Sequence, residues 1–121
     1  MRICKTFDWE AAHKLKLPYE SKCKNIHGHS YKVSVMLEGP INKNGMVIDF
    51  SMLKKWVEGV SFDHKYLNDI MEDDNPTAEN LVMYVKYFLE KTRTKEIPNH
   101  IKIKKIRVYE TATSFAEEEW K

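Results

Sequence analysis

The residues best suited to chemistry in this chain lie in one short run, Cys23-Lys24-Asn25-Ile26-His27-Gly28-His29, and at His13 upstream of it. Three of the five histidines and one of the two cysteines therefore fall within the 17 residues from His13 to His29. In extended backbone, His27 and His29 are two residues apart, so both imidazoles leave the same face. Gly28 carries no side chain and lets the backbone bend between them. The spacing predicts a metal site of three nitrogens with a thiol beside it.

Three neutral imidazoles on Zn²⁺ leave a fourth position open for water or substrate, which is the arrangement of catalytic rather than structural zinc sites. A structural site would close all four positions, usually with paired thiolates, and no Cys-x-x-Cys occurs in this sequence. Cys23 itself is open to three interpretations: a fourth zinc ligand, a small buried apolar residue or a nucleophile. Spacing alone does not choose among them.

Length and composition predict a single domain spanning residues 1–121. Hydrophobic residues make up 42% and charged residues 31% of the chain, which is ordinary for a soluble globular protein. The net charge of +2 is too small to indicate a nucleic-acid partner. No apolar run approaches the ~18 residues of a membrane span, and the first residues lack the pattern of a signal peptide. We therefore expect a cytoplasmic protein with no nucleic-acid partner, no membrane association and no disulfide.

Alternating apolar residues and helical periodicity predict four strands and two helices. The expected strands are Ile3–Ala11, His29–Glu38, Ile101–Tyr109 and about Ser114–Trp120, and the expected helices run from about Ser51 to Val60 and from Pro76 past Leu89. Asp49 or Ser51 is expected to cap the first helix and Asn75 the second. Between the helices, Phe62–Asp69 is expected to form a short charged connection.

This ββααββ order predicts an α+β fold, in which a four-stranded antiparallel sheet carries two helices on one face. In the third strand the apolar residues change from odd to even positions, which indicates a β-bulge near Lys104-Lys105. A sheet this small has two open edges that must be covered or paired, most simply by other subunits. We therefore expect a homo-oligomer.

Five motifs in order along the chain resemble the 6-pyruvoyltetrahydropterin synthase / 6-carboxytetrahydropterin synthase family. They are Phe7–His13, Cys-x-x-x-His-Gly-His from Cys23, Asp63–Asp69, Asn75–Asn80 and Val108–Thr111. The resemblance covers the chain nearly end to end. It implies the tunnelling fold (T-fold), in which the sheets of three subunits join into a barrel and two trimers stack as a hexamer.

The three residues between Cys23 and His27 are similar to those of bacterial 6-carboxytetrahydropterin synthases of the queuosine (7-deazaguanine) pathway. This resemblance implies a Zn²⁺-dependent lyase that converts 7,8-dihydroneopterin triphosphate to 6-carboxy-5,6,7,8-tetrahydropterin, acetaldehyde and triphosphate. A 6-pyruvoyltetrahydropterin synthase or another enzyme that cleaves the pterin side chain is the near alternative. Two further hypotheses are a non-catalytic zinc- or pterin-binding module and a metal-hydroxide hydrolase in which Cys23 is incidental.

The resemblance also implies a role for each matching residue. His13, His27 and His29 match the zinc ligands, and Cys23 matches the catalytic cysteine, whose thiolate would accept a proton. That thiolate needs a cation nearby, and the metal, Lys22 or Lys24 is expected to supply it. The remaining matches are an acid–base pair at Asp63 and His64, a pterin anchor at Glu110 that also counts as catalytic, and substrate-pocket residues at Thr77 and Glu79.

Several of these residues also have a purely structural interpretation. The carboxylate of Glu110 can accept two parallel N–H bonds from a pterin ring, but it also fits a surface position on a strand. Thr77 and Glu79 equally fit the first turn of a helix. The five lysines around the metal run, Lys14, Lys16, Lys22, Lys24 and Lys32, form either a funnel for a triphosphate or, for most of them, a solvated face.

Overall fold

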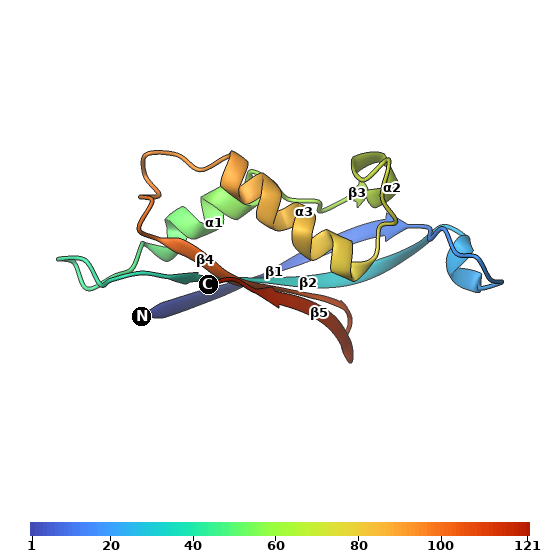
Figure 1. The fold of residues 1–121 in the computed structure, drawn as a ribbon, viewed down its shortest axis with the longest axis horizontal. Coiled ribbons are helices and arrows are strands. Elements are labelled where there is room, and N and C mark those ends of the chain that lie inside the picture. Colours follow the sequence, from blue (N-terminus) through green and yellow to red (C-terminus); the bar gives the residue numbers. More distant parts are fainter.

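The long helices α1 (Phe50–Glu58) and α3 (Ala78–Lys91) lie together on one face of a twisted sheet (Figure 1), in a computed structural model that describes residues 1–121. The remaining elements are β1 (Arg2–His13), the 3₁₀ turn η1 (Lys22–Lys24), β2 (His27–Glu38), β3 (Lys65–Tyr66), α2 (Leu67–Ile70), β4 (Lys102–Thr111) and β5 (Ser114–Glu119). The five strands are ordered β3-β1-β2-β4-β5. The predicted α+β class and the helices on one face are confirmed.

The sheet differs from the prediction by one strand. β3 pairs in parallel with Ala11 and Ala12 of β1, so the sheet is mixed and five-stranded rather than antiparallel and four-stranded. Two residues are too short a segment to show the alternation that reveals a strand in a sequence. The segment expected as a plain connection between the helices thus contains β3 and the single turn α2.

β1 and β2 both extend further than predicted, and the extension includes two of the candidate metal ligands. The two strands pair from Arg2 opposite Glu38 to His13 opposite His27. Odd-numbered residues of both strands face the helices, with Trp9 on β1 and Tyr31 on β2 nearly fully buried. The apolar pattern stops at the histidines, although the backbone remains extended through them.

The predicted bulge in β4 is confirmed. Met36 of β2 pairs with Lys105, whereas its neighbour Leu37 pairs with Ile103, so Lys104 is the extra residue. The insertion reverses the alternation and keeps Ile103 and Ile106 on the same buried face. These side chains belong to one core of 25 buried apolar residues.

The helix caps confirm one prediction and correct another. The Asp49 carboxylate accepts the backbone N–H of Ser51 at 2.8 Å and caps α1, as expected. α3 is capped by the Thr77 hydroxyl, which accepts the backbone N–H of Asn80, and not by Asn75. Pro76 therefore precedes the cap and is not the first helical residue. Asn75 cannot serve as the cap because its side-chain amide is bonded to the backbone of Lys16.

None of the helices combines the length and the apolar character that crossing a membrane requires.

Candidate metal centre and active site

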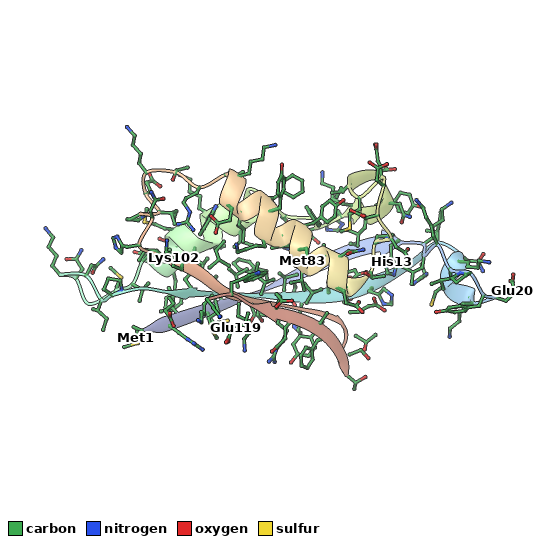
Figure 2. All side chains as sticks on the ribbon, in the orientation of Figure 1. Met1, His13, Glu20, Met83, Lys102 and Glu119 are labelled. Carbon is green, nitrogen blue, oxygen red and sulfur yellow. The ribbon has the colours of Figure 1, made fainter.

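The three candidate metal ligands meet where the β1–β2 pair ends. His13 is the last residue of β1 and lies opposite His27, the first residue of β2, while His29 follows on the same face. Their ligand nitrogens all lie within 4.8 Å of one another. Figure 2 shows His13 at the end of the sheet from which the loop carrying Glu20 projects, far from Met1. The expected convergence of the three imidazoles is therefore present in the structure.

Backbone carbonyls fix the tautomers of two of these rings. His13 Nδ1 lies 2.7 Å from the carbonyl oxygen of Pro76, and His27 Nδ1 lies 2.8 Å from that of Asn25. Because a carbonyl only accepts, each Nδ1 carries the proton and each neutral ring has its lone pair on Nε2. The two Nε2 atoms are 2.9 Å apart. Two lone pairs facing each other at this distance repel, and a cation between them removes the repulsion.

The third ring offers a free nitrogen to the same point. His29 Nε2 is buried and has no hydrogen-bond partner, and Glu110 Oε1 lies 3.6 Å from it, outside hydrogen-bond range. Burial lowers the pKa of both His13 and His29 and keeps them neutral, the form in which imidazole binds a metal. An unpartnered buried nitrogen next to two facing lone pairs fits a divalent metal with histidine ligands, including Zn²⁺.

Cys23 lies in η1, in the loop that leaves this end of the sheet, and is partly buried. Its backbone carbonyl accepts the N–H of Leu15 at 2.8 Å, and its N–H donates to Ser21 Oγ at 3.1 Å. The group of clustered ligand atoms comprises the three histidines and does not include the Cys23 thiol. Within one chain, the Cys23 thiol is therefore not one of the grouped metal ligands.

Asp63 and His64 are fastened to the outer edge of β1. Asp63 Oδ1 accepts the backbone N–H of Glu10 at 2.7 Å, and the His64 N–H donates to the Glu10 carbonyl at 2.6 Å. His64 has a φ of 58°, a left-handed conformation that is costly for a residue other than glycine and is often found at functional sites. Its Nε2 lies 3.6 Å from Asp63 Oδ2. His64 and His29 line the same pocket, of about 500 Å³.

Glu110 is the predicted residue closest to the histidines on the β4 side. It extends from the end of β4 toward His29, and with Glu79 of α3 it lines a separate pocket of about 510 Å³. Thr77 stands apart from this pair because its hydroxyl is occupied in capping α3. The structure thus brings Glu110 and Glu79 together and gives Thr77 a structural role.

The sequence of this chain matches the model of the family described as 6-pyruvoyl tetrahydropterin synthase over residues 2–120. The protein belongs to the 6-pyruvoyl tetrahydropterin synthase family. Its fold is similar to that of 6-pyruvoyl tetrahydropterin synthase from Caenorhabditis elegans, with a TM-score of 0.85, 25% identity and coverage of 100% of this chain and 96% of the other. The predicted family and T-fold are confirmed, and the protein is an enzyme of lyase type.

Curated relatives within the 6-pyruvoyl tetrahydropterin synthase family carry two different names. A protein of Pyrococcus furiosus named dihydroneopterin monophosphate aldolase is 38% identical, covering 98% of this chain and 97% of the relative. A protein of Haemophilus influenzae named 6-carboxy-5,6,7,8-tetrahydropterin synthase is 35% identical, covering 96% of both. One from Synechocystis with the same name is 35% identical over 94% of this chain and 89% of its own.

One functional candidate of this family member was missed in the sequence. Tyr31 is 1% exposed, and its hydroxyl lies 3.3 Å from His13 Nδ1, the nitrogen that donates to the Pro76 carbonyl. Burial raises the pKa of the Tyr31 phenol, so it stays neutral beneath the metal ligands. The available signal was its spacing, since Tyr31 continues the odd-numbered row of His27 and His29.

The lysines near the metal ligands are mostly engaged with neighbours in this chain. Lys32 Nζ lies 2.7 Å from Asp8 Oδ1, Lys24 Nζ lies 3.5 Å from Glu20 Oε1, and Lys16 Nζ lies 3.4 Å from the Glu72 carbonyl. All of these are exposed contacts. Such exposed contacts favour a solvated face over a dedicated triphosphate funnel.

Proposed function

We propose that this protein is a Zn²⁺-dependent enzyme that converts 7,8-dihydroneopterin triphosphate and water to 6-carboxy-5,6,7,8-tetrahydropterin, acetaldehyde and triphosphate, as in queuosine biosynthesis. The observation that carries the proposal is the cluster of His13, His27 and His29, with two Nε2 lone pairs turned toward each other and a third buried Nε2 unpartnered. Relatives named for this activity, at 35% identity, support the assignment.

The three imidazoles would hold Zn²⁺ through Nε2. When bound, this ion would act as a Lewis acid for the oxygens of the pterin side chain and make the adjacent C–H bond more acidic. Pro76 and Asn25 accept the Nδ1 protons of His13 and His27, which orients both rings and makes their Nε2 atoms better donors.

Two groups, one on each side of the bound substrate, would transfer protons. Cys23 lies in the loop at η1, and its thiolate would take a proton from the substrate side chain. His64 would act as a second acid or base, with Asp63 beside it to stabilise its protonated form. The 3.6 Å between His64 Nε2 and Asp63 Oδ2 leaves the imidazole free to turn toward a substrate, because no hydrogen bond holds it.

Glu110 would anchor the pterin ring. Its carboxylate is partly exposed and extends into the space next to His29, where it can accept two parallel N–H bonds from the 2-amino group and N3. Glu79 lines the adjoining pocket and is proposed as a second contact with the substrate. Thr77 would contribute only through its backbone, because its hydroxyl caps α3.

The sheet edges support the proposed assembly into trimers and a hexamer. β3 covers β1 only at Ala11 and Ala12, and Asp63 and His64 bond Glu10 next to them, so the β1 edge before Glu10 and the outer edge of β5 have no partner strand in the chain. Cys23, His64 and the metal ligands also do not form one cluster within a single chain. A site completed by neighbouring subunits would resolve both features.

An aldolase is the second candidate function, and the relative from Pyrococcus furiosus at 38% identity favours it. An aldolase would break the bond between C1′ and C2′ of dihydroneopterin monophosphate and release glycolaldehyde phosphate and 6-hydroxymethyl-7,8-dihydropterin. The same metal site and the same proton acceptor would suit this reaction, because both reactions begin by removing a proton from the side chain.

Product identification separates these activities. Purified, zinc-replete protein would be incubated separately with dihydroneopterin triphosphate and monophosphate, and the products identified by mass spectrometry. Acetaldehyde with 6-carboxytetrahydropterin supports the proposal. A hydroxymethyl product from the monophosphate establishes the aldolase instead, and a 6-pyruvoyl product without acetaldehyde establishes the pyruvoyl synthase.

A further inference from the structure

Two asparagine side chains bind the backbone directly after the metal ligand His13. The Asn68 amide accepts the N–H of Lys14 at 2.9 Å and donates to the carbonyl of Lys14 at 2.9 Å. The Asn75 amide makes the same pair of bonds, both 2.9 Å, with the N–H and carbonyl of Lys16. Each amide therefore satisfies both backbone groups of one residue.

The two asparagine amides bond residues 14–16 in the way that a neighbouring strand bonds the edge of a sheet. In extended backbone, alternate residues direct their N–H and carbonyl to the same side, so Lys14 and Lys16 face one edge and Leu15 faces the other. The Leu15 N–H donates to the Cys23 carbonyl at 2.8 Å on that other edge. Residues 14–16 thus lie between the two asparagines on one side and the Cys23 loop on the other.

Both asparagines are linked to the metal ligand His13, Asn68 through Lys14 and Asn75 through Pro76. Lys14 follows His13 directly, and Asn75 directly precedes Pro76, whose carbonyl holds the His13 ring at 2.7 Å. Asn75 is itself fixed, because its own carbonyl accepts the side-chain amide of Asn80 at 2.8 Å. A shift of the Asn75 segment would therefore move the carbonyl that orients His13 and also residues 14–16, whose Leu15 bonds the Cys23 carbonyl.

We propose that Asn68 and Asn75 are positioning residues, whose side-chain amides hold residues 14–16 extended and thereby set where Cys23 lies relative to the metal ligands. The inference deepens the proposed function, since Cys23 and His13 are the groups which that function uses. The four bonds are exposed, so they contribute little to global stability. Their effect is on geometry, and displacements of about 1 Å in a reacting group can cost about 100-fold in rate.

The test compares Asn68→Ala and Asn75→Ala with Asn99→Ala, a matched control at an exposed asparagine whose side chain makes no hydrogen bond. All variants carry Cys4→Ser, so that alkylation reports on Cys23 alone. Hydrogen exchange of the backbone amides, the rate of Cys23 alkylation, zinc content, and kcat and KM on the pterin substrate are measured in the assembled, zinc-replete protein.

We expect amide exchange at Lys14 and Lys16 to accelerate at least about tenfold in the corresponding alanine variants, with core amides of β4 unchanged. Alkylation of Cys23 should change several-fold in rate, and kcat should fall about 10–100-fold with KM within about threefold, because Glu110 still anchors the ring. Asn75→Asp keeps the oxygen that accepts the Lys16 N–H and loses the N–H donor. The Lys16 amide should therefore stay protected from exchange, and kcat should lie between those of the parent and Asn75→Ala.

Three results overturn the proposal. Unchanged exchange at residues 14–16 means that the amides do not hold this segment. Faster exchange with alkylation and kcat equal to those of Asn99→Ala means that the segment does not position Cys23. Equally accelerated exchange in β4 means that the asparagines act on the whole fold. Exchange and alkylation need no substrate, so they decide the inference even if the proposed reaction proves wrong.

Discussion

Substitution of His64 separates two properties of this residue, its imidazole and its left-handed backbone. Its φ is 58° and its side chain is 82% exposed, so removing the imidazole costs almost no packing. In this region, a residue with a Cβ is less stable than glycine by about 1–2 kcal/mol of backbone strain. Glycine in turn costs about 0.5–1 kcal/mol through the greater entropy of the unfolded chain.

These magnitudes predict that His64→Gly leaves the free energy of unfolding unchanged or raises it by up to about 1.5 kcal/mol. His64→Ala keeps the strained backbone and should stay within about 0.5 kcal/mol of the parent. Both variants lose the proposed acid–base group, so kcat should fall about 10²- to 10⁴-fold in each. The change in stability is thus expected to depend on the backbone conformation at this position, and the change in kcat on the loss of the imidazole.

Thermal unfolding and product formation from dihydroneopterin triphosphate test this pair of expectations. All variants are compared at one protein concentration, because assembly makes Tm depend on concentration. His64→Asn is the control, since asparagine tolerates the left-handed region but offers no base. A glycine variant that is destabilised by more than about 1 kcal/mol would refute the strain argument. An alanine variant that keeps more than half of kcat would refute the acid–base role.

Three further predictions address the metal ligands, the thiol and the cap of α3. Because burial lowers the pKa of folded His13 and His29, the unfolded chain binds protons first as the solution is acidified. The contribution of these two rings to the stability of the metal-free protein should therefore be fully present above pH ~6.5. It should fall as the pH drops toward their lowered pKa values, by at most about 1.4 kcal/mol per pH unit for each ring. A Tm independent of pH from 7.5 to 5 contradicts this. Cys23→Ala should lose at least about 100-fold in kcat with zinc content unchanged, and full activity would exclude the thiol as proton acceptor. Thr77→Ala should cost about 1 kcal/mol in denaturant unfolding while Thr77→Ser costs almost nothing; equal losses would mean that the hydroxyl does not cap the helix.

Local sequence pattern was sufficient for several parts of the fold. The alternation in β2 set the buried face, and the same parity placed His27 and His29 together, because a strand repeats every two residues. The change of parity in β4 placed the bulge near Lys104-Lys105, since an extra residue is what reverses the alternation, and the structure assigns it to Lys104. In each case the signal lies within about ten consecutive residues, where backbone geometry alone relates one side chain to the next.

Other features depended on partners distant in sequence. Asn75 and Thr77 are both good cap residues, and the choice of Thr77 followed from the contact of Asn75 with Lys16, 59 positions away. β3 exists because Lys65 meets the edge of β1, and not because of its own residues.

The candidate site also has features that the sequence determined and features that only the tertiary structure decided. Residue types and spacing determined which three histidines could share a metal, because that information is chemical and local. The tautomer of His13 and the burial that keeps His13 neutral were decided only by the tertiary structure. Both depend on the carbonyl and the apolar layer that the fold brings next to the His13 ring, and Pro76 is 63 positions away in the sequence.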